Sequence, residues 1–223
     1  MRGRTISAGL VALLVLLTAH CIGAERGYFV FSGSAAQEAM DLTFRCKSDA
    51  NWLYVEYTVH NNTASDLYSY DGAPGVPSDN PEWPDATQQV YISFRAPGAV
   101  QIKRMRAPIP PGQRLAQVRI PVVARVKPGA ARVVRFRIHL PLSERSEYTP
   151  DFSGATYEER VVNTIEMWVG YFALDPRAQL APLPDHPDLF QVHSQSANQL
   201  LAHCAVAHTV KVRVRTDPKF QRL

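Results

Sequence analysis

Apolar and polar residues alternate with a period of two along several segments of this 223-residue chain. This period is typical of β-strands that bury one face, because successive side chains of a strand point to opposite sides of the sheet. Only Ser194–Ala202 fits a helix, of about two turns. The pattern therefore predicts an all-β fold. Its clearest strands are Leu42–Cys46, Leu53–Val59, Val118–Val126, Val134–Leu140, Ile165–Tyr171 and Val210–Val214, with weaker ones at Tyr28–Phe31, Leu67–Tyr70 and Val90–Phe94.

Short connections between these segments favour antiparallel hairpins. Lys47–Asn51 and Lys127–Ala130 contain the Asp, Asn, Pro and Gly residues that are typical of turns. Hairpins with little helix indicate two packed sheets rather than a parallel sheet covered by helices. We therefore expect an antiparallel two-sheet sandwich.

The segment Val55–Tyr68 resembles a hairpin that is common in bacterial immunoglobulin-like sandwich domains. In such a hairpin a turn of Asn, Ser and Thr residues joins two strands, and Asn61–Ser65 stands at that place here. The resemblance covers this segment alone. It implies an immunoglobulin-like two-sheet fold and no activity, because one fold serves many functions.

The N-terminus has the features of a secretory signal peptide. Arg2 and Arg4 precede the apolar run Ala8–Leu17. This run is shorter than the roughly 20 apolar residues that cross a bilayer. We therefore predict that residues 1–24 are removed, and that residues 25–223 form a single domain that is periplasmic or secreted. Attachment of a lipid at Cys21 is the alternative, which the preceding His20 disfavours.

Cys46 and Cys204 remain after removal of residues 1–24. An even pair of cysteines in an oxidising compartment favours a disulfide bond. Both residues share the apolar phase of their neighbours, so both side chains should point into the core. The sequence therefore predicts a Cys46–Cys204 disulfide.

Two Pro-rich stretches, residues 71–87 and 175–187, are predicted as long loops. The second stretch and the residues after it bring imidazole and carboxylate groups together, which can bind zinc or copper. Their spacing matches no known ligand pattern, and the chain lacks the strong motifs of nucleophilic, zinc-dependent and nucleotide-dependent enzymes. A metal-binding or hydrolytic protein is therefore the alternative function, and no cofactor is expected. The residues of this cluster are Asp185, His186, Asp188 and His193.

Cationic residues occupy the polar phase of several predicted strands. If these strands share a sheet, the cations form one electropositive face that can bind phospholipid head groups, acidic glycan or an acidic protein. The simpler alternative is that outward charges only prevent association of strand edges. The residues are Arg119, Arg125, Arg135, Arg137, Lys211, Arg213 and Arg215.

A hydrophobic content of 46% is that of a chain with a packed core, and the formal net charge of +4 indicates no particular partner. We therefore predict an exported, non-catalytic binding or accessory module of the cell envelope whose ligand is unknown. The candidate partners are an envelope protein or an anionic envelope surface, and no nucleic acid is expected.

Overall fold

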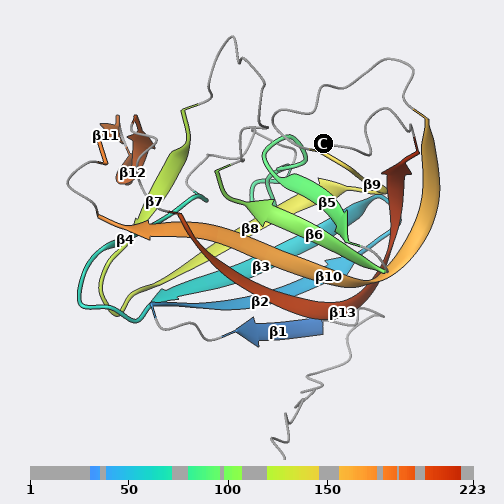
Figure 1. Cartoon of the computed structure of the whole chain (residues 1–223), viewed down its shortest axis with the longest axis horizontal. Coiled ribbons are helices and arrows are strands. Elements are labelled where there is room, and N and C mark those ends of the chain that lie inside the picture. The colour runs from blue at the N-terminus through green and yellow to red at the C-terminus, as the bar shows by residue number, and fades with distance from the viewer. Residues whose placement is uncertain are drawn as a thin grey trace, which may run out of the picture.

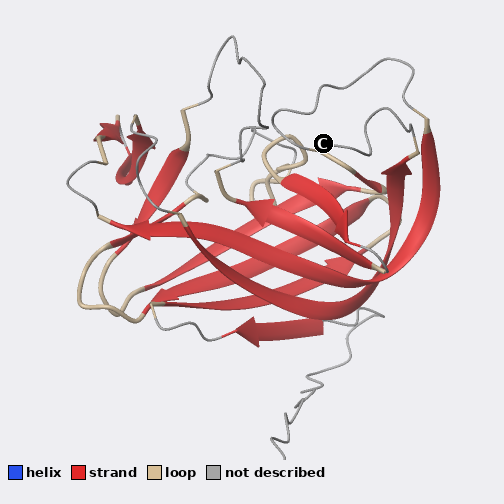
Figure 2. Cartoon of the chain, in the orientation of Figure 1, coloured by secondary structure: helices blue, strands red, loops and turns tan. Residues whose placement is uncertain are grey.

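The computed structural model describes residues 31–35, 39–71, 80–95, 98–106, 120–145, 156–174, 178–184, 186–193 and 199–216. The predicted signal peptide lies outside these ranges. The described residues form strands and no helix (Figure 2), which confirms the prediction of an all-β fold. Among them, no helical segment has the length and hydropathy required to cross a bilayer.

The strands form two sheets (Figure 1). The four-stranded sheet has the order β1 (Phe31–Ala35), β2 (Met40–Ser48), β3 (Trp52–Asn61) and β8 (Ala131–His139). In the nine-stranded sheet, the order along the main path is β11 (Leu180–Leu183), β12 (His186–Val192), β7 (Val122–Val126), β4 (Leu67–Ser69), β10 (Tyr157–Ala173), β13 (Leu200–Arg215) and β9 (Leu142–Ser143). Two further strands extend this sheet from β10: β6 (Ala99–Arg104) and, beyond it, β5 (Tyr91–Arg95).

One hydrophobic core lies between the two sheets. Phe44 and Leu53 come from the four-stranded sheet, and Ile165 and Val212 come from the nine-stranded sheet; all four belong to one cluster of buried side chains. Figure 1 shows β10 and β13 curving across the strands of the four-stranded sheet. Burial of each such side chain contributes about 1.5–3 kcal/mol, so the period-two pattern supplies the main force that holds the sheets together.

Two of the strand pairs are parallel, β6 with β10 and β9 with β13. The other pairs of named strands are antiparallel. The expected antiparallel arrangement is therefore corrected at these two pairs. Alternation along a strand shows which face is buried, but it carries no information on the direction of the neighbouring strand.

Two predicted hairpins instead join the two sheets. The turn after β3 leads to β4 in the nine-stranded sheet, and Lys127–Ala130 leads from β7 back to β8 in the four-stranded sheet. These two arches lie side by side, because β3 pairs with β8 and β4 pairs with β7. The segment that resembles a hairpin therefore contains its two strands, but they do not pair with each other.

Asn61 holds the two arches together from a fully buried position. Its Nδ2 donates to the carbonyl oxygens of Ser65 and Val126 at 2.8 Å each. Its backbone carbonyl accepts from the N–H of Gly129, which has a φ of 67°. Glycine adopts this left-handed conformation without steric cost, so it allows the second arch to turn against the first.

The second Pro-rich stretch is not a loop throughout. Residues 180–183 and 186–192 form β11 and β12, which pair with each other, and β12 pairs with β7. A second cluster of side chains covers this part of the sheet, with Tyr68 stacked on Phe172 and in edge contact with Phe190. The expected helix is also corrected, because Leu200–Ala202 begins β13 and residues 194–198 lie outside the described ranges.

Candidate functional site

The predicted cations do not share one sheet. Arg125 and Arg213 lie on β7 and β13 of the nine-stranded sheet, whereas Arg135 and Arg137 lie on β8 of the four-stranded sheet. Lys211 and Arg215 are also on β13, where Lys211 is exposed and Arg215 is buried; Arg119 lies outside the described residues. Anion binding by these cations stays a prediction, but it must be assigned to separate surfaces.

Several of these cations form ion pairs with carboxylates on neighbouring strands. Arg125 donates from Nη2 to Asp188 Oδ1 at 2.8 Å, and Arg213 donates from Nε to Glu159 at 3.1 Å. Cross-strand pairs of opposite charge of this kind stabilise a sheet modestly. These ion pairs explain the presence of Arg125 and Arg213 on the polar phase without a bound ligand.

The outer face of the four-stranded sheet has a different composition. Strand register places residues from β2, β3 and β8 in rows across this face. One row is Arg45, Glu56 and Arg135, the next is Lys47, Tyr54 and Arg137, and the third is Trp52 and His139. Together with Trp83, these residues define what we call the aromatic–cation face.

Rings and cations contact one another on the aromatic–cation face. The Arg137 guanidinium lies 4.0 Å from the centroid of the Trp52 ring, and the Trp52 ring meets His139 edge-on at 5.0 Å. The Lys47 ammonium lies 5.3 Å from the Tyr54 ring and 5.7 Å from the Trp83 ring. Such cation–π contacts contribute about 0.5–1 kcal/mol each at exposed sites and more where the cation is buried, as Arg137 is, so they restrict the positions of these side chains.

Trp83 reaches the aromatic–cation face because its segment docks against β8. The Arg137 N–H donates to the carbonyl oxygen of Pro84, and the Ala86 N–H donates to that of Arg137, both at 3.0 Å. These bonds extend the sheet by a short parallel bridge at Asp85. The Trp83 ring then meets Tyr54 edge-on at 5.5 Å, which places a residue of the first Pro-rich stretch over a strand.

Glu56 lies between two arginines in the first row. Arg135 Nε donates to Glu56 Oε2 at 2.7 Å, and Arg45 pairs with Oε1 of the same carboxylate. Partial burial raises the pKa of the Glu56 carboxyl, but hydrogen bonds and charge from Arg45 and Arg135 outweigh burial and hold this pKa below its ordinary value. The row therefore carries two cations and one carboxylate at neutral pH.

The sequence predicts only part of the aromatic–cation face. Arg135 and Arg137 are among the predicted cations, but Arg45, Lys47 and Trp83 are not. Arg45 and Lys47 occupy the polar phase of β2, so the alternation of that strand could have identified them. For Trp83, no periodic signal exists, because it lies outside the strands.

The outer face of the nine-stranded sheet also contains an aromatic residue, Trp168. Its ring stacks on His203 with centroids 4.3 Å apart, and its Nε1 donates to Glu166 at 3.0 Å. Gln101 donates to the same carboxylate oxygen at 2.7 Å, and the Ser93 hydroxyl donates to Gln101. These hydrogen bonds link the side chains of Ser93, Gln101, Glu166 and Trp168 in one row.

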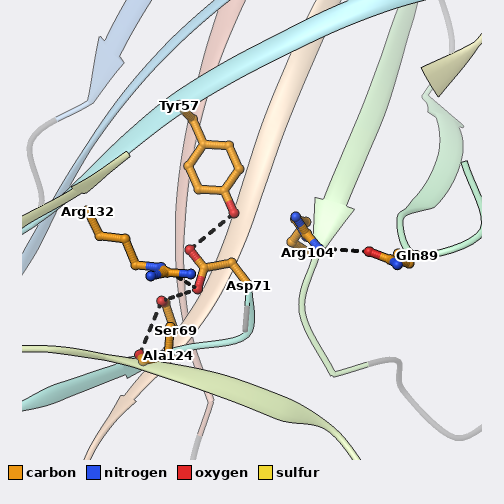
Figure 3. A network of polar contacts seen from close by, with 7 residues as sticks. All are labelled: Tyr57, Ser69, Asp71, Gln89, Arg104, Ala124 and Arg132. Carbon is orange, nitrogen blue, oxygen red and sulfur yellow. Dashed lines mark hydrogen bonds and ion pairs between the residues drawn. The ribbon is translucent and has the colours of Figure 1, made fainter. Parts of the chain in front are cut away.

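A polar network lies inside the core near the arches (Figure 3). The Asp71 carboxylate is fully buried and accepts hydrogen bonds from Ser69 Oγ at 2.6 Å and Tyr57 Oη at 3.2 Å. Arg132 Nε lies 3.5 Å from the same carboxylate, and the buried Arg104 donates to Gln89 at 3.4 Å. Burial, followed by the negative charge of Asp71, raises the pKa of Tyr57 well above its ordinary value, so the phenol stays protonated as a donor.

The predicted disulfide is not present in the structure. Cys46 and Cys204 are both buried in the core, as their phase predicts, but they are free thiols. Burial raises the pKa of each thiol to about 12. Phase alone places a side chain in the core, whereas a disulfide also requires Cα atoms within about 7 Å and matched Cβ directions.

The predicted His and Asp cluster is only partly described. Asp185 lies outside the described residues, His186 and Asp188 lie on β12, and His193 follows β12 directly. The Asp188 carboxylate bonds to Arg125, which holds its pKa below the ordinary value. Among the described residues, no three His, Cys, Asp or Glu side chains gather closely enough to hold a metal ion.

Comparison of the chain with models of known protein families, with curated proteins and with solved structures gives no match. The fold and the surface chemistry are therefore the basis for the function proposed below.

Proposed function

We propose that this protein is an exported, non-catalytic binding or accessory module of the cell envelope, with an immunoglobulin-like β-sandwich fold. Two sheets around one core, with consecutive strands crossing between them, support this fold class. The signal-peptide features of residues 1–24 support export.

The aromatic–cation face is the contact surface of this module. Trp, Tyr and Arg are enriched where proteins bind partners, because they combine a large contact area with directed polar groups. Here they lie on adjacent strands of a paired sheet, in fixed register. This concentration of ring and cation is the observation that supports the proposal.

The proposal predicts binding to envelope fragments of the producing cell that depends on this face. The double variant Arg45→Ala/Arg135→Ala removes two exposed cations that pair with Glu56. We expect its bound fraction in co-sedimentation at low salt to fall well below that of the wild type, because charge complementarity is lost.

The matched control is Arg95→Ala/Arg160→Ala, which removes two exposed arginines from β5 and β10 of the nine-stranded sheet. It should bind as the wild type does. Equal loss in both double variants would indicate non-specific charge and would refute the aromatic–cation face as the contact surface. If protein recovered from the envelope still begins with Met1, the prediction that residues 1–24 are removed is refuted.

A further inference from the structure

We infer that the ligand of the aromatic–cation face is a polyanionic carbohydrate, that is, a glycan chain with carboxylate, sulfate or phosphate groups. This inference rests on the proposed function, since it names the ligand class of the same surface. Four features of the face lead to it: its charge, its ring placement, the ion pair at its middle and its linear form.

The charge of the face selects an anionic ligand. Its two charged rows contain Arg45, Lys47, Arg135 and Arg137 against the carboxylate of Glu56, and the exposed carboxylate of Asp49 accepts from the Tyr54 hydroxyl beside them. The pKa of Glu56 is held low by its arginine partners, so the carboxylate stays ionised and the rows keep a net positive charge at neutral pH. A ligand with several anionic groups binds more tightly to such rows, and salt reduces this increase in affinity.

The placement of the rings argues against membrane insertion. Trp52, Tyr54 and Trp83 are half-buried, and none of them is among the strongly exposed large hydrophobic residues. A surface that binds lipid buries protruding apolar side chains about 5–10 Å into the head-group boundary. Half-buried rings instead offer an apolar patch level with the cations, against which the C–H groups of a sugar ring can pack.

The middle of the face argues against a dry protein interface. The ion-paired Glu56 lies at the centre of its row, beside the row of Lys47 and Arg137. The buried centre of a protein interface is depleted of charged residues, because their desolvation is costly. A hydrated glycan leaves the exposed arginines of the Glu56 row, Arg45 and Arg135, in contact with water and does not incur that cost.

The face is also linear. Successive rows lie two residues apart along β3, which corresponds to about 7 Å, so the three rows from Trp52 to Glu56 extend for about 14 Å. A glycan chain repeats ring and anionic group along its length. Along this length, cations lie in the first two rows and rings in the second and third rows, so one glycan chain can contact both kinds of side chain.

The test measures binding of the purified mature protein to alginate, a polyuronate, by affinity electrophoresis in low salt. We expect Arg45→Ala/Arg135→Ala to weaken binding about tenfold, or about 1.4 kcal/mol, because it removes two exposed cations from the face. Glu56→Gln should strengthen binding, because it removes the one carboxylate from the charged rows. A merely structural role of Glu56 would give no such gain.

A second set of variants tests the rings. Trp83→Ala should weaken alginate binding in low and high salt alike, because ring packing is not screened, whereas Trp168→Ala on the other sheet should leave it unchanged. Neutral dextran should not bind. Circular dichroism of each variant shows whether the fold is retained.

Probes of other classes separate the possible failures. Face-dependent binding to polyglutamate or to phosphatidylglycerol vesicles, without binding to alginate or dextran sulfate, would overturn the glycan inference and leave the proposed function standing. If the wild type binds alginate and Arg45→Ala/Arg135→Ala binds it equally well, the inference is overturned. If neither envelope fragments nor any probe responds to variants of the face, the proposed function fails as well.

Discussion

At the scale of single residues, Asp71 shows how a polar group is accommodated inside an apolar core. Its carboxylate follows the inward phase of β4 and is fully buried, with hydrogen bonds from Tyr57 and Ser69. Arg132 supplies the opposite charge at 3.5 Å. A buried carboxylate persists only when donors and a cation compensate for its lost hydration.

We predict that Asp71→Asn lowers the free energy of unfolding by about 3 kcal/mol, because it breaks the ion pair of a fully buried carboxylate with the partly exposed Arg132 and changes an acceptor into a partial donor. Urea denaturation measures this loss. The control is Asp188→Asn, whose carboxylate pairs with Arg125 at the surface and is 49% exposed. It should cost less than about 1 kcal/mol, and equal losses in the two variants would show that burial of Asp71 does not govern its contribution.

Arg137 shows the limit of residue-level prediction. The alternation of β8 places Arg137 on the polar phase, yet the residue is buried, with its guanidinium 4.0 Å from the centroid of the Trp52 ring. Nothing in the local pattern shows that Trp52 packs on this side chain or that residues 84–86 pair with its backbone. Arg135, two residues away on the same strand, follows the pattern and is exposed.

At the scale of elements, the two arches decide which sheet each strand joins. Asn61 connects them through two side-chain donors and through its backbone, and it also accepts from the N–H and hydroxyl of Thr63. An arch and a hairpin can carry the same turn residues, because both reverse the chain. The difference lies in the partners of the strands that follow.

We predict that Asn61→Asp destabilises the protein by about 2–4 kcal/mol at pH 7, because a buried carboxylate would replace the amide that donates to two carbonyl oxygens. Asn62→Asp, at the exposed neighbouring position, is the matched control and should change stability by less than about 0.5 kcal/mol. Thermal melts of both variants provide the measurement. A similar melting temperature for Asn61→Asp and the wild type would contradict the role of Asn61 as the clamp of the arches.

The longest elements extend beyond their sequence signals. β10 spans Tyr157–Ala173 and β13 spans Leu200–Arg215, whereas alternation predicts only their central or final parts. In β10, residues 157–161 are exposed on both faces, so no alternation of burial marks them. Their strand form depends on pairing with β13, which no local pattern expresses.

At the scale of the whole molecule, the two sheets share one core and should lose their structure together. Trp52 and Trp83 lie on the four-stranded sheet, and Trp168 lies on the nine-stranded sheet; the chain contains three tryptophans. Each sheet therefore has its own fluorescence reporter.

We predict one cooperative unfolding transition. Trp168→Phe leaves reporters on the four-stranded sheet, and Trp52→Phe/Trp83→Phe leaves one on the nine-stranded sheet. In each variant, the urea midpoint measured by fluorescence should coincide with that measured by far-ultraviolet circular dichroism. Separate midpoints within one variant would show that the sheets unfold as independent units, against a single domain.

The sequence by itself determined the all-β class, the strands from Leu42 to Cys46 and from Leu53 to Val59, and the burial of both cysteines in the core, because alternation is a local property of the chain and each strand buries one face. Only the tertiary structure decided that β3 and β4 join different sheets, that β6 lies parallel to β10, and that Trp83 covers the aromatic–cation face. These features depend on contacts between segments far apart in the chain. Period and turn chemistry describe each segment alone, so they cannot select its neighbours.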